Sequence, residues 1–153
     1  MAIRVKAAAL ALAAGAGLAL TQSGTAAAAG HWVPGLHQSH DHSRDVDTGM
    51  NGVEVHGRIY WSDIYKISIA GVVQDNARDG KGAVAEVGYY YQGSNGWTWT
   101  TRTAAKASGG YGSSTQFKAR NYTSGLHNGV WMKGVKLRAC LETSQARVCG
   151  AWR

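Results

Sequence analysis

Hydrophobic side chains recur at every second position along most of the chain from Val53 onward, and this period is the strongest constraint on the fold. Val53, Val55 and Ile59 alternate with polar neighbours, which is the pattern of a strand with one buried and one wet face. Turn-forming clusters of Gly, Asn, Asp and Ser separate further runs of this kind, at 65–74, 85–91, 97–103, 117–120, 130–142 and 147–152. About seven short strands predict an all-β, antiparallel β-sandwich, with a flattened β-barrel as the alternative.

The first thirty residues have the composition of a secretory signal peptide. Arg4 and Lys6 precede an apolar run at 7–20, and small residues follow up to Ala29. The apolar run is shorter than the ~20 residues that a membrane helix needs. We therefore expect cleavage near Ala28, a secreted, extracellular protein, and no membrane span in the mature chain.

Residues 29–52 are polar and irregular, so we predict a flexible N-terminal arm between a signal peptide at 1–28 and a β-sandwich domain at 53–153. Imidazole and carboxylate groups in such an arm are suited to Cu, Ni or Zn. The candidate metal ligands in the arm are His31, His37, His40, Asp41 and His42. A solvated polar arm that merely contains histidines is the competing interpretation, and no other cofactor is expected.

The cleavage site decides a second form of the metal hypothesis. If cleavage follows Ala28, the mature chain begins Ala29-Gly30-His31. The terminal amine, two backbone amides and the imidazole then form a square-planar set of nitrogens, which Cu(II) and Ni(II) prefer. Cleavage one residue later would remove this arrangement.

Two cysteines, Cys140 and Cys149, lie in the part of the chain that is predicted to be exported. Because disulfides persist in oxidising compartments, we predict that these residues are bonded to each other.

A direct pairing of the cysteines predicts the register of a C-terminal hairpin. It sets Leu141 opposite Val148 and Glu142 opposite Arg147, so that apolar meets apolar and opposite charges meet. Leu141, Val148 and Trp152 are expected on the core side, whereas Glu142, Arg147 and the disulfide are expected on the other side.

Three segments carry a resemblance to a known group of proteins. They are the aromatic run Val87-Gly88-Tyr89-Tyr90-Tyr91, the run Gly96-Trp97-Thr98-Trp99, and the closing segment from Val135 to Trp152 with its two cysteines. This pattern resembles small secreted β-domain proteins of actinobacteria, including streptomycetes, that end in a disulfide hairpin. The resemblance implies an exported, disulfide-closed β domain and implies no catalytic residue.

The chain is basic, with a formal net charge of +7, which falls to +5 if Arg4 and Lys6 leave with the signal peptide. Such a charge favours anionic partners as a long-range bias. On the polar faces of the predicted strands, the basic residues are Arg58, Arg102, Lys118, Arg120, Lys136 and Arg138. If these strands share one sheet, they form a basic platform for an anionic cell-wall or extracellular polymer; if they do not, the charges are merely solvated.

Aromatic residues divide by the same alternation. The rings that share the apolar parity, and are predicted to be in the core, are Tyr89, Tyr91, Trp97 and Trp99. Tyr60 and Tyr90 fall on polar faces and are the candidates for exposed contacts.

No hydrolase, metalloprotease, phosphate-loop or dinucleotide motif occurs in the sequence. We therefore expect a non-catalytic secreted protein, monomeric and without a specific nucleic-acid partner, that binds anionic extracellular or cell-wall polymers through a basic sheet face. The alternatives are Cu, Ni or Zn binding by the arm, and an inhibitor or toxin that acts through the loops at 75–82 and 109–114.

Overall fold

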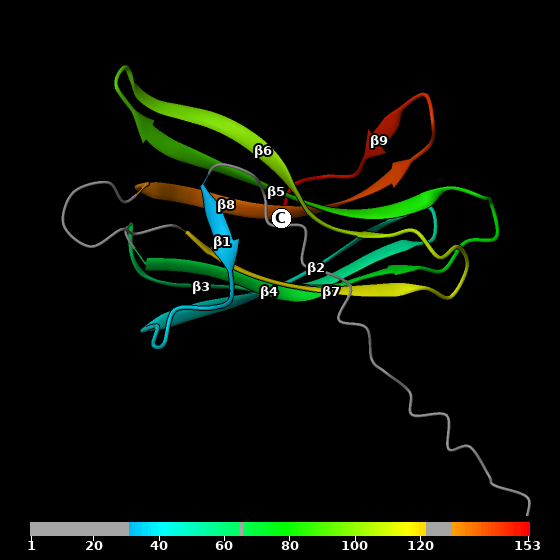
Figure 1. Cartoon of the computed structure of the whole chain (residues 1–153), viewed down its shortest axis with the longest axis horizontal. Coiled ribbons are helices and arrows are strands. Elements are labelled where there is room, and N and C mark those ends of the chain that lie inside the picture. The colour runs from blue at the N-terminus through cyan, green and yellow to red at the C-terminus, as the bar shows by residue number, and fades with distance from the viewer. Residues whose placement is uncertain (1–30, 65, 122–129) are drawn as a thin grey trace, which may run out of the picture.

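The computed structural model describes residues 31–64, 66–121 and 130–153, which form two antiparallel β-sheets in face-to-face layers (Figure 1). The five-stranded sheet has the order β1-β7-β4-β3-β2 and the four-stranded sheet the order β6-β5-β8-β9. The strands are β1 (Trp32–Pro34), β2 (His42–Met50), β3 (Val53–Asp63), β4 (Lys66–Asp75), β5 (Gly82–Gly93), β6 (Gly96–Ala107), β7 (Ser114–Asn121), β8 (Met132–Glu142) and β9 (Arg147–Cys149). The predicted all-β sandwich is confirmed.

The prediction of a flexible arm at 29–52 is wrong for β1 and β2. β2 is the edge strand of the larger sheet and is antiparallel to β3 over its whole length. An edge strand with one wet face keeps few apolar residues, and here only Val46 is fully buried, so the hydrophobic period is faint. Asn51 and Gly52, with φ of 43° and 82°, form the two-residue turn that joins β2 to β3.

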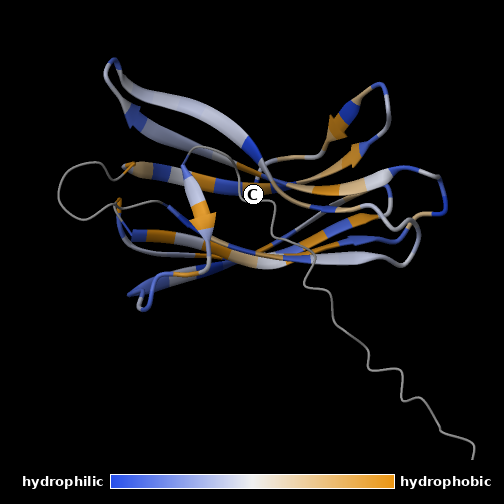
Figure 2. Cartoon of the chain, in the orientation of Figure 1, coloured by the Kyte–Doolittle hydropathy of each residue, from blue (hydrophilic) through white to orange (hydrophobic). Residues whose placement is uncertain are grey.

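The core lies between the inner faces of the two sheets. Hydrophobic residues recur along the strands of both layers (Figure 2), and those that point inward are almost completely buried. The largest fully buried hydrophobic side chains are Tyr89, Phe117, Ile69, Met132 and Leu137. Burial of this apolar surface is the main force that holds the sheets together.

Two paired glycines make room for this packing. Gly57 of β3 lies opposite Gly71 of β4. A Cβ on Gly57 would lie 2.7 Å from a methyl carbon of Leu137, and one on Gly71 would lie 2.7 Å from the ring of Phe117. Side chains from both layers therefore occupy the volume above these two residues.

The C-terminal hairpin has the predicted register. Cys140 pairs with Cys149 in a disulfide, Leu141 lies opposite Val148, and Glu142 lies opposite Arg147. Val148 is nevertheless 58% exposed, because β9 extends beyond the edge of the core.

The predicted position of Trp152 on the core side is wrong. The Gly150 amide donates to the carbonyl of Ala139, whereas Arg153 exchanges two backbone hydrogen bonds with Leu137. From Gly150 to Arg153 the tail advances by three residues, whereas β8 advances by two from Ala139 to Leu137. This extra residue in the tail reverses the alternation of its side chains. Trp152 consequently lies on the outer face, against Arg138.

Candidate binding face

The six basic residues predicted to share a platform are divided between the two sheets. Arg58 lies on β3, and Lys118 and Arg120 lie on β7, all in the five-stranded sheet. Lys136 and Arg138 lie on β8 of the four-stranded sheet, with their side chains on its outer face.

Arg102 lies apart from both groups. It pairs with Val87, whose side chain is in the core, so Arg102 points to the inner side of the edge strand β6. Its guanidinium donates to the carbonyl of Thr101 and to the hydroxyl of Thr100. A single platform built from all six residues is therefore not formed.

The outer face of the five-stranded sheet carries charges of both signs. Arg58 forms a two-bond ion pair with Asp45, at 2.5 and 2.9 Å. His56 contacts Asp47 at 2.9 Å and Glu54 at 3.5 Å. These acidic partners reduce the attraction of this face for a polyanion.

Two histidines on this face have pKa values that are shifted in opposite directions from the usual 6.5. The hydrogen bond to Asp47 raises the pKa of His56. The stabilisation that protonated His56 contributes is therefore complete below pH 6.5 and is lost as the pH rises through the raised pKa. Burial and the neighbouring His37 and Lys66 lower the pKa of His40, so its protonation opposes folding and stability falls as the pH drops below 6.5.

A histidine titration followed by NMR measures both effects. We expect a midpoint above 6.5 for His56 and below 6.5 for His40. The Asp47→Asn variant is the control, because it should return the midpoint of His56 toward 6.5 and leave that of His40 in place. Identical midpoints for the two residues would contradict this account.

The predicted metal ligands do not converge on one point. His37 and His40 lie together, with ring centres 5.8 Å apart. The His37 ring donates to Oδ1 of Asn121, and the His40 ring forms a hydrogen bond with the hydroxyl of Ser68. His31 contacts the hydroxyl of Tyr89 at 3.0 Å. Elsewhere, His42 stacks on Trp61, and the Asp41 amide donates to Ser62. Metal binding by the arm stays a prediction, and Ala29 and Gly30 lie outside the described residues.

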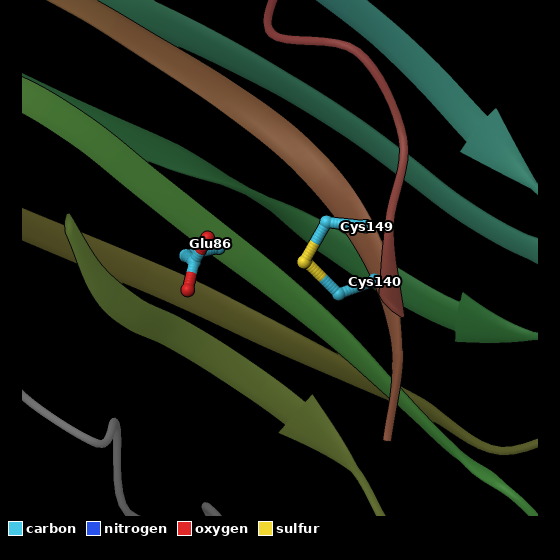
Figure 3. Close-up of side chains that lie close together, drawn as sticks. All are labelled: Glu86, Cys140 and Cys149. Atoms are coloured by element: carbon cyan, nitrogen blue, oxygen red, sulfur yellow. A yellow bond between two sulfur atoms is a disulfide. The ribbon is translucent and has the colours of Figure 1, made fainter. Parts of the chain in front are cut away.

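Within the described ranges, one set of three potential metal ligands lies close together (Figure 3), and its chemistry does not suit a metal. Glu86 lies beside Cys140 and Cys149, but the two sulfur atoms are bonded to each other. The carboxylate instead accepts hydrogen bonds from Arg138 at 2.6 Å and Arg147 at 3.4 Å. The arrangement is thus a buried ion-pair cluster under a disulfide.

This cluster continues across the outer face of the four-stranded sheet. Glu142 pairs with Lys106 of β6 and with Arg147, and the Lys106 hydrogen bond is the main reason that the pKa of Glu142 is lowered. The face carries two carboxylates, Glu86 and Glu142, and five basic side chains: Lys106, Lys133, Lys136, Arg138 and Arg147. We call this set of seven residues the basic face.

The prediction that Trp97 and Trp99 belong to the core is wrong. Ala85 pairs with Ala105, whereas the next residue, Glu86, pairs with Thr103, so β6 contains one extra residue. This β-bulge reverses the alternation along the rest of β6. Trp97 is 37% exposed, and both rings lie on the same outer face as Glu86.

Tyr89 and Tyr91, also predicted to be in the core, do face it. Tyr89 is fully buried, and Tyr91 packs against the core cluster. Of the two candidates for exposed contacts, Tyr90 is 41% exposed on the four-stranded sheet, and Tyr60 is half-buried beside His40 on the other sheet.

A glycine in β5 lets the outer tryptophans pack closely against the strand. A Cβ on Gly88 would lie 2.5 Å from the ring of Trp99 and 2.7 Å from that of Trp152. The two rings meet edge to face with centres 5.4 Å apart, and the Arg138 guanidinium lies 4.1 Å from the centre of Trp152. Aromatic and basic groups are therefore interleaved on this face.

Comparison with family models finds none that matches the chain, and comparisons with curated proteins and with solved structures find no match either. The resemblance to secreted actinobacterial proteins thus stays a prediction from the sequence.

Proposed function

We propose that the protein is a non-catalytic binding protein whose basic face holds an anionic polymer. The observation that carries this proposal is the charge of that face, where five basic side chains accompany two carboxylates. Glu86 and Glu142 are already held by Lys106, Arg138 and Arg147, and no carboxylate of the described residues pairs with Lys133 or Lys136. These two ammonium groups are available to an anionic ligand.

The ion pairs also favour binding over catalysis at this face. Glu86 is the buried carboxylate here, and both of its oxygens contact guanidinium groups, Oε2 that of Arg138 and Oε1 that of Arg147. A general acid or base would need a carboxyl group free to exchange a proton with a substrate.

An extracellular location is part of the proposal. Its support is the Cys140–Cys149 disulfide, which persists in oxidising compartments, together with the signal peptide predicted at 1–28. The described residues contain no helix that is long and apolar enough to cross a membrane.

The proposal is tested with polygalacturonate, a polymer of uronate sugars, and the double variant Lys133→Gln and Lys136→Gln. Because each lysine contact releases bound counterions, we expect the slope of log affinity against log salt concentration to become shallower by roughly one to two. Isothermal titration calorimetry at several salt concentrations measures this slope.

The matched control removes two basic residues from the other sheet, Lys118→Gln and Arg120→Gln. This control lowers the net charge of the protein by the same amount, so it accounts for the long-range attraction. An equal loss of affinity in both double variants would overturn the assignment to the basic face.

A further inference from the structure

Three exposed aromatic side chains gather at one end of the basic face. Tyr90 and Trp131 are each 41% exposed and Trp97 is 37% exposed. Gln92 of β5 lies between Trp97 of β6 and Trp131, whose carbonyl accepts the Gln92 amide. We call Tyr90, Trp97 and Trp131 the aromatic end.

Folding does not explain this exposure, because burying these rings would stabilise the domain. Among the described residues, five large hydrophobic side chains are exposed, and three of them form the aromatic end. Clustered exposed apolar surface is typical of a binding site, whereas scattered single residues are ordinary.

Basic groups lie directly beside these rings. The Lys133 ammonium is 4.0 Å from the ring centre of Trp97, and Lys133 lies opposite Tyr90. Lys136 follows on the same face, opposite Gly88. A ligand that suits this site therefore needs apolar ring faces and negative charge within a few ångströms of each other.

We propose that the aromatic end binds the sugar rings of an acidic polysaccharide, while Lys133 and Lys136 pair with its carboxylate or sulfate groups. The C–H face of a pyranose ring is apolar and packs on an aromatic ring, while the hydroxyl groups around its rim remain in water. This inference rests on the proposed function and names the ligand class for that face.

The ring geometry favours sugars over nucleic-acid bases. Tyr90 of the aromatic end is inclined by 62° to its neighbour Trp99, and Trp99 by 87° to Trp152, so the rings that continue from this end do not form the run of similar planes on which successive bases stack. A sugar needs only one ring surface at a time. The oxidising location that the disulfide indicates also favours an extracellular glycan.

Charge also disfavours a second copy of the chain as the occupant. Two basic faces brought together would place Lys133 and Lys136 opposite positive groups, which is repulsive. The complementary partner is therefore an anion.

The test compares three ligands of the intact protein: polygalacturonate, methyl-esterified polygalacturonate and inorganic polyphosphate. The first has rings and charge, the second has rings with little charge, and the third has charge without rings. We expect the variants Trp97→Ala and Tyr90→Ala each to weaken polygalacturonate binding about tenfold, by analogy with the loss of one stacking contact to a base. Their affinity for polyphosphate should stay within about twofold of wild type.

Tyr111→Ala is the control, because Tyr111 is 57% exposed in a loop and lies against Arg78 rather than on this face. It should leave all three affinities unchanged. Unfolding midpoints in urea verify that each variant is folded, and calorimetry measures the affinities.

Four outcomes would overturn the inference. If Trp97→Ala and Tyr90→Ala lose equal affinity for polygalacturonate and for polyphosphate, the rings have only a structural role. If oligo(dT) binds more tightly than polygalacturonate, with the same dependence on Trp97, the site is assigned to nucleic acid. A Trp97-dependent dimer in sedimentation would assign it to self-association. If only Lys133→Gln and Lys136→Gln weaken polygalacturonate binding and Trp97→Ala does not, the proposed function stands and the role of the aromatic rings is rejected.

The converse result separates the two proposals. If the lysine variants bind polygalacturonate normally while Trp97→Ala and Tyr90→Ala do not, then the rings bind sugar and the anionic-polymer function is overturned. Binding of the methyl-esterified polymer at the same affinity as the acid form would lead to the same conclusion.

Discussion

Replacing Glu86 with glutamine is expected to lower the free energy of unfolding by about 3 kcal/mol, the lower end of what breaking a buried ion pair costs. The Glu86 side chain is 8% exposed. Its Oε2 lies 2.5 Å from Nη2 of Arg138, and its Oε1 lies 3.4 Å from Nη1 of Arg147. Glutamine keeps the shape but removes the charge, so two guanidinium groups lose their shared buried partner. Both are partly exposed, at 24% and 30%, and recover some hydration, which keeps the loss from being larger.

Urea denaturation of wild type and of the Glu86→Gln variant measures this loss. Glu54→Gln is the matched control, because Glu54 is on a neighbouring sheet with a side chain that is 50% exposed, and exposed pairs contribute less than about 1 kcal/mol. A Glu86→Gln variant as stable as the control would show that the cluster is not a stabilising centre.

An alanine at Gly71 is expected to destabilise the sandwich by about 3 kcal/mol, at the upper end of overpacking costs. Its Cβ would lie 2.5 Å from the carbonyl oxygen of His56, 2.8 Å from the Cα of Gly57 and 2.7 Å from the ring of Phe117. Two of these three atoms are backbone of the neighbouring strand, so relief requires β3 and β4 to separate.

Gly82→Ala is the control for Gly71→Ala. The closest atom to a Cβ at Gly82 is the Cε of Lys106, at 3.3 Å, and this flexible side chain can move away. Thermal and urea unfolding should show Gly82→Ala within about 1 kcal/mol of wild type. If Gly71→Ala were equally mild, the close approach of the two strands would not be a constraint on the fold.

Local alternation was enough to predict the sandwich and its final hairpin. In the hairpin, three facing pairs agree with one register, including Cys140 with Cys149 and Glu142 with Arg147. Alternation was insufficient for β2, whose polar composition is typical of both an edge strand and a loop. The turn at Asn51 and Gly52 was the available signal, since this dipeptide commonly joins two strands.

The position of the aromatic residues could not be predicted, because single extra residues reverse a period of two. One such residue, near Ala104 in β6, places Trp97 and Trp99 outside, and another in the tail does the same for Trp152. In sequence these segments look regular, and each bulge is visible only against the partner strand. Trp97, Trp99 and Trp152 were therefore missed as surface residues.

The basic face was missed for a related reason. Alternation indicates whether a side chain points inward or outward, but it does not indicate which sheet a strand joins. β7 pairs with β4, whereas β8 pairs with β5, so Lys118 and Lys136 lie on opposite sides of the sandwich. Pairing between strands distant in sequence depends on the packing of the whole domain.

Chemical-shift mapping with polygalacturonate, on uniformly ¹⁵N-labelled protein, tests the central claim most directly. We predict that the largest shifts fall on the indole N–H of Trp97 and on the backbone amides of Tyr90, Lys133 and Lys136, which lie on one face of the four-stranded sheet. Largest shifts around Lys118 and Arg120, on the outer face of the five-stranded sheet, would contradict the account.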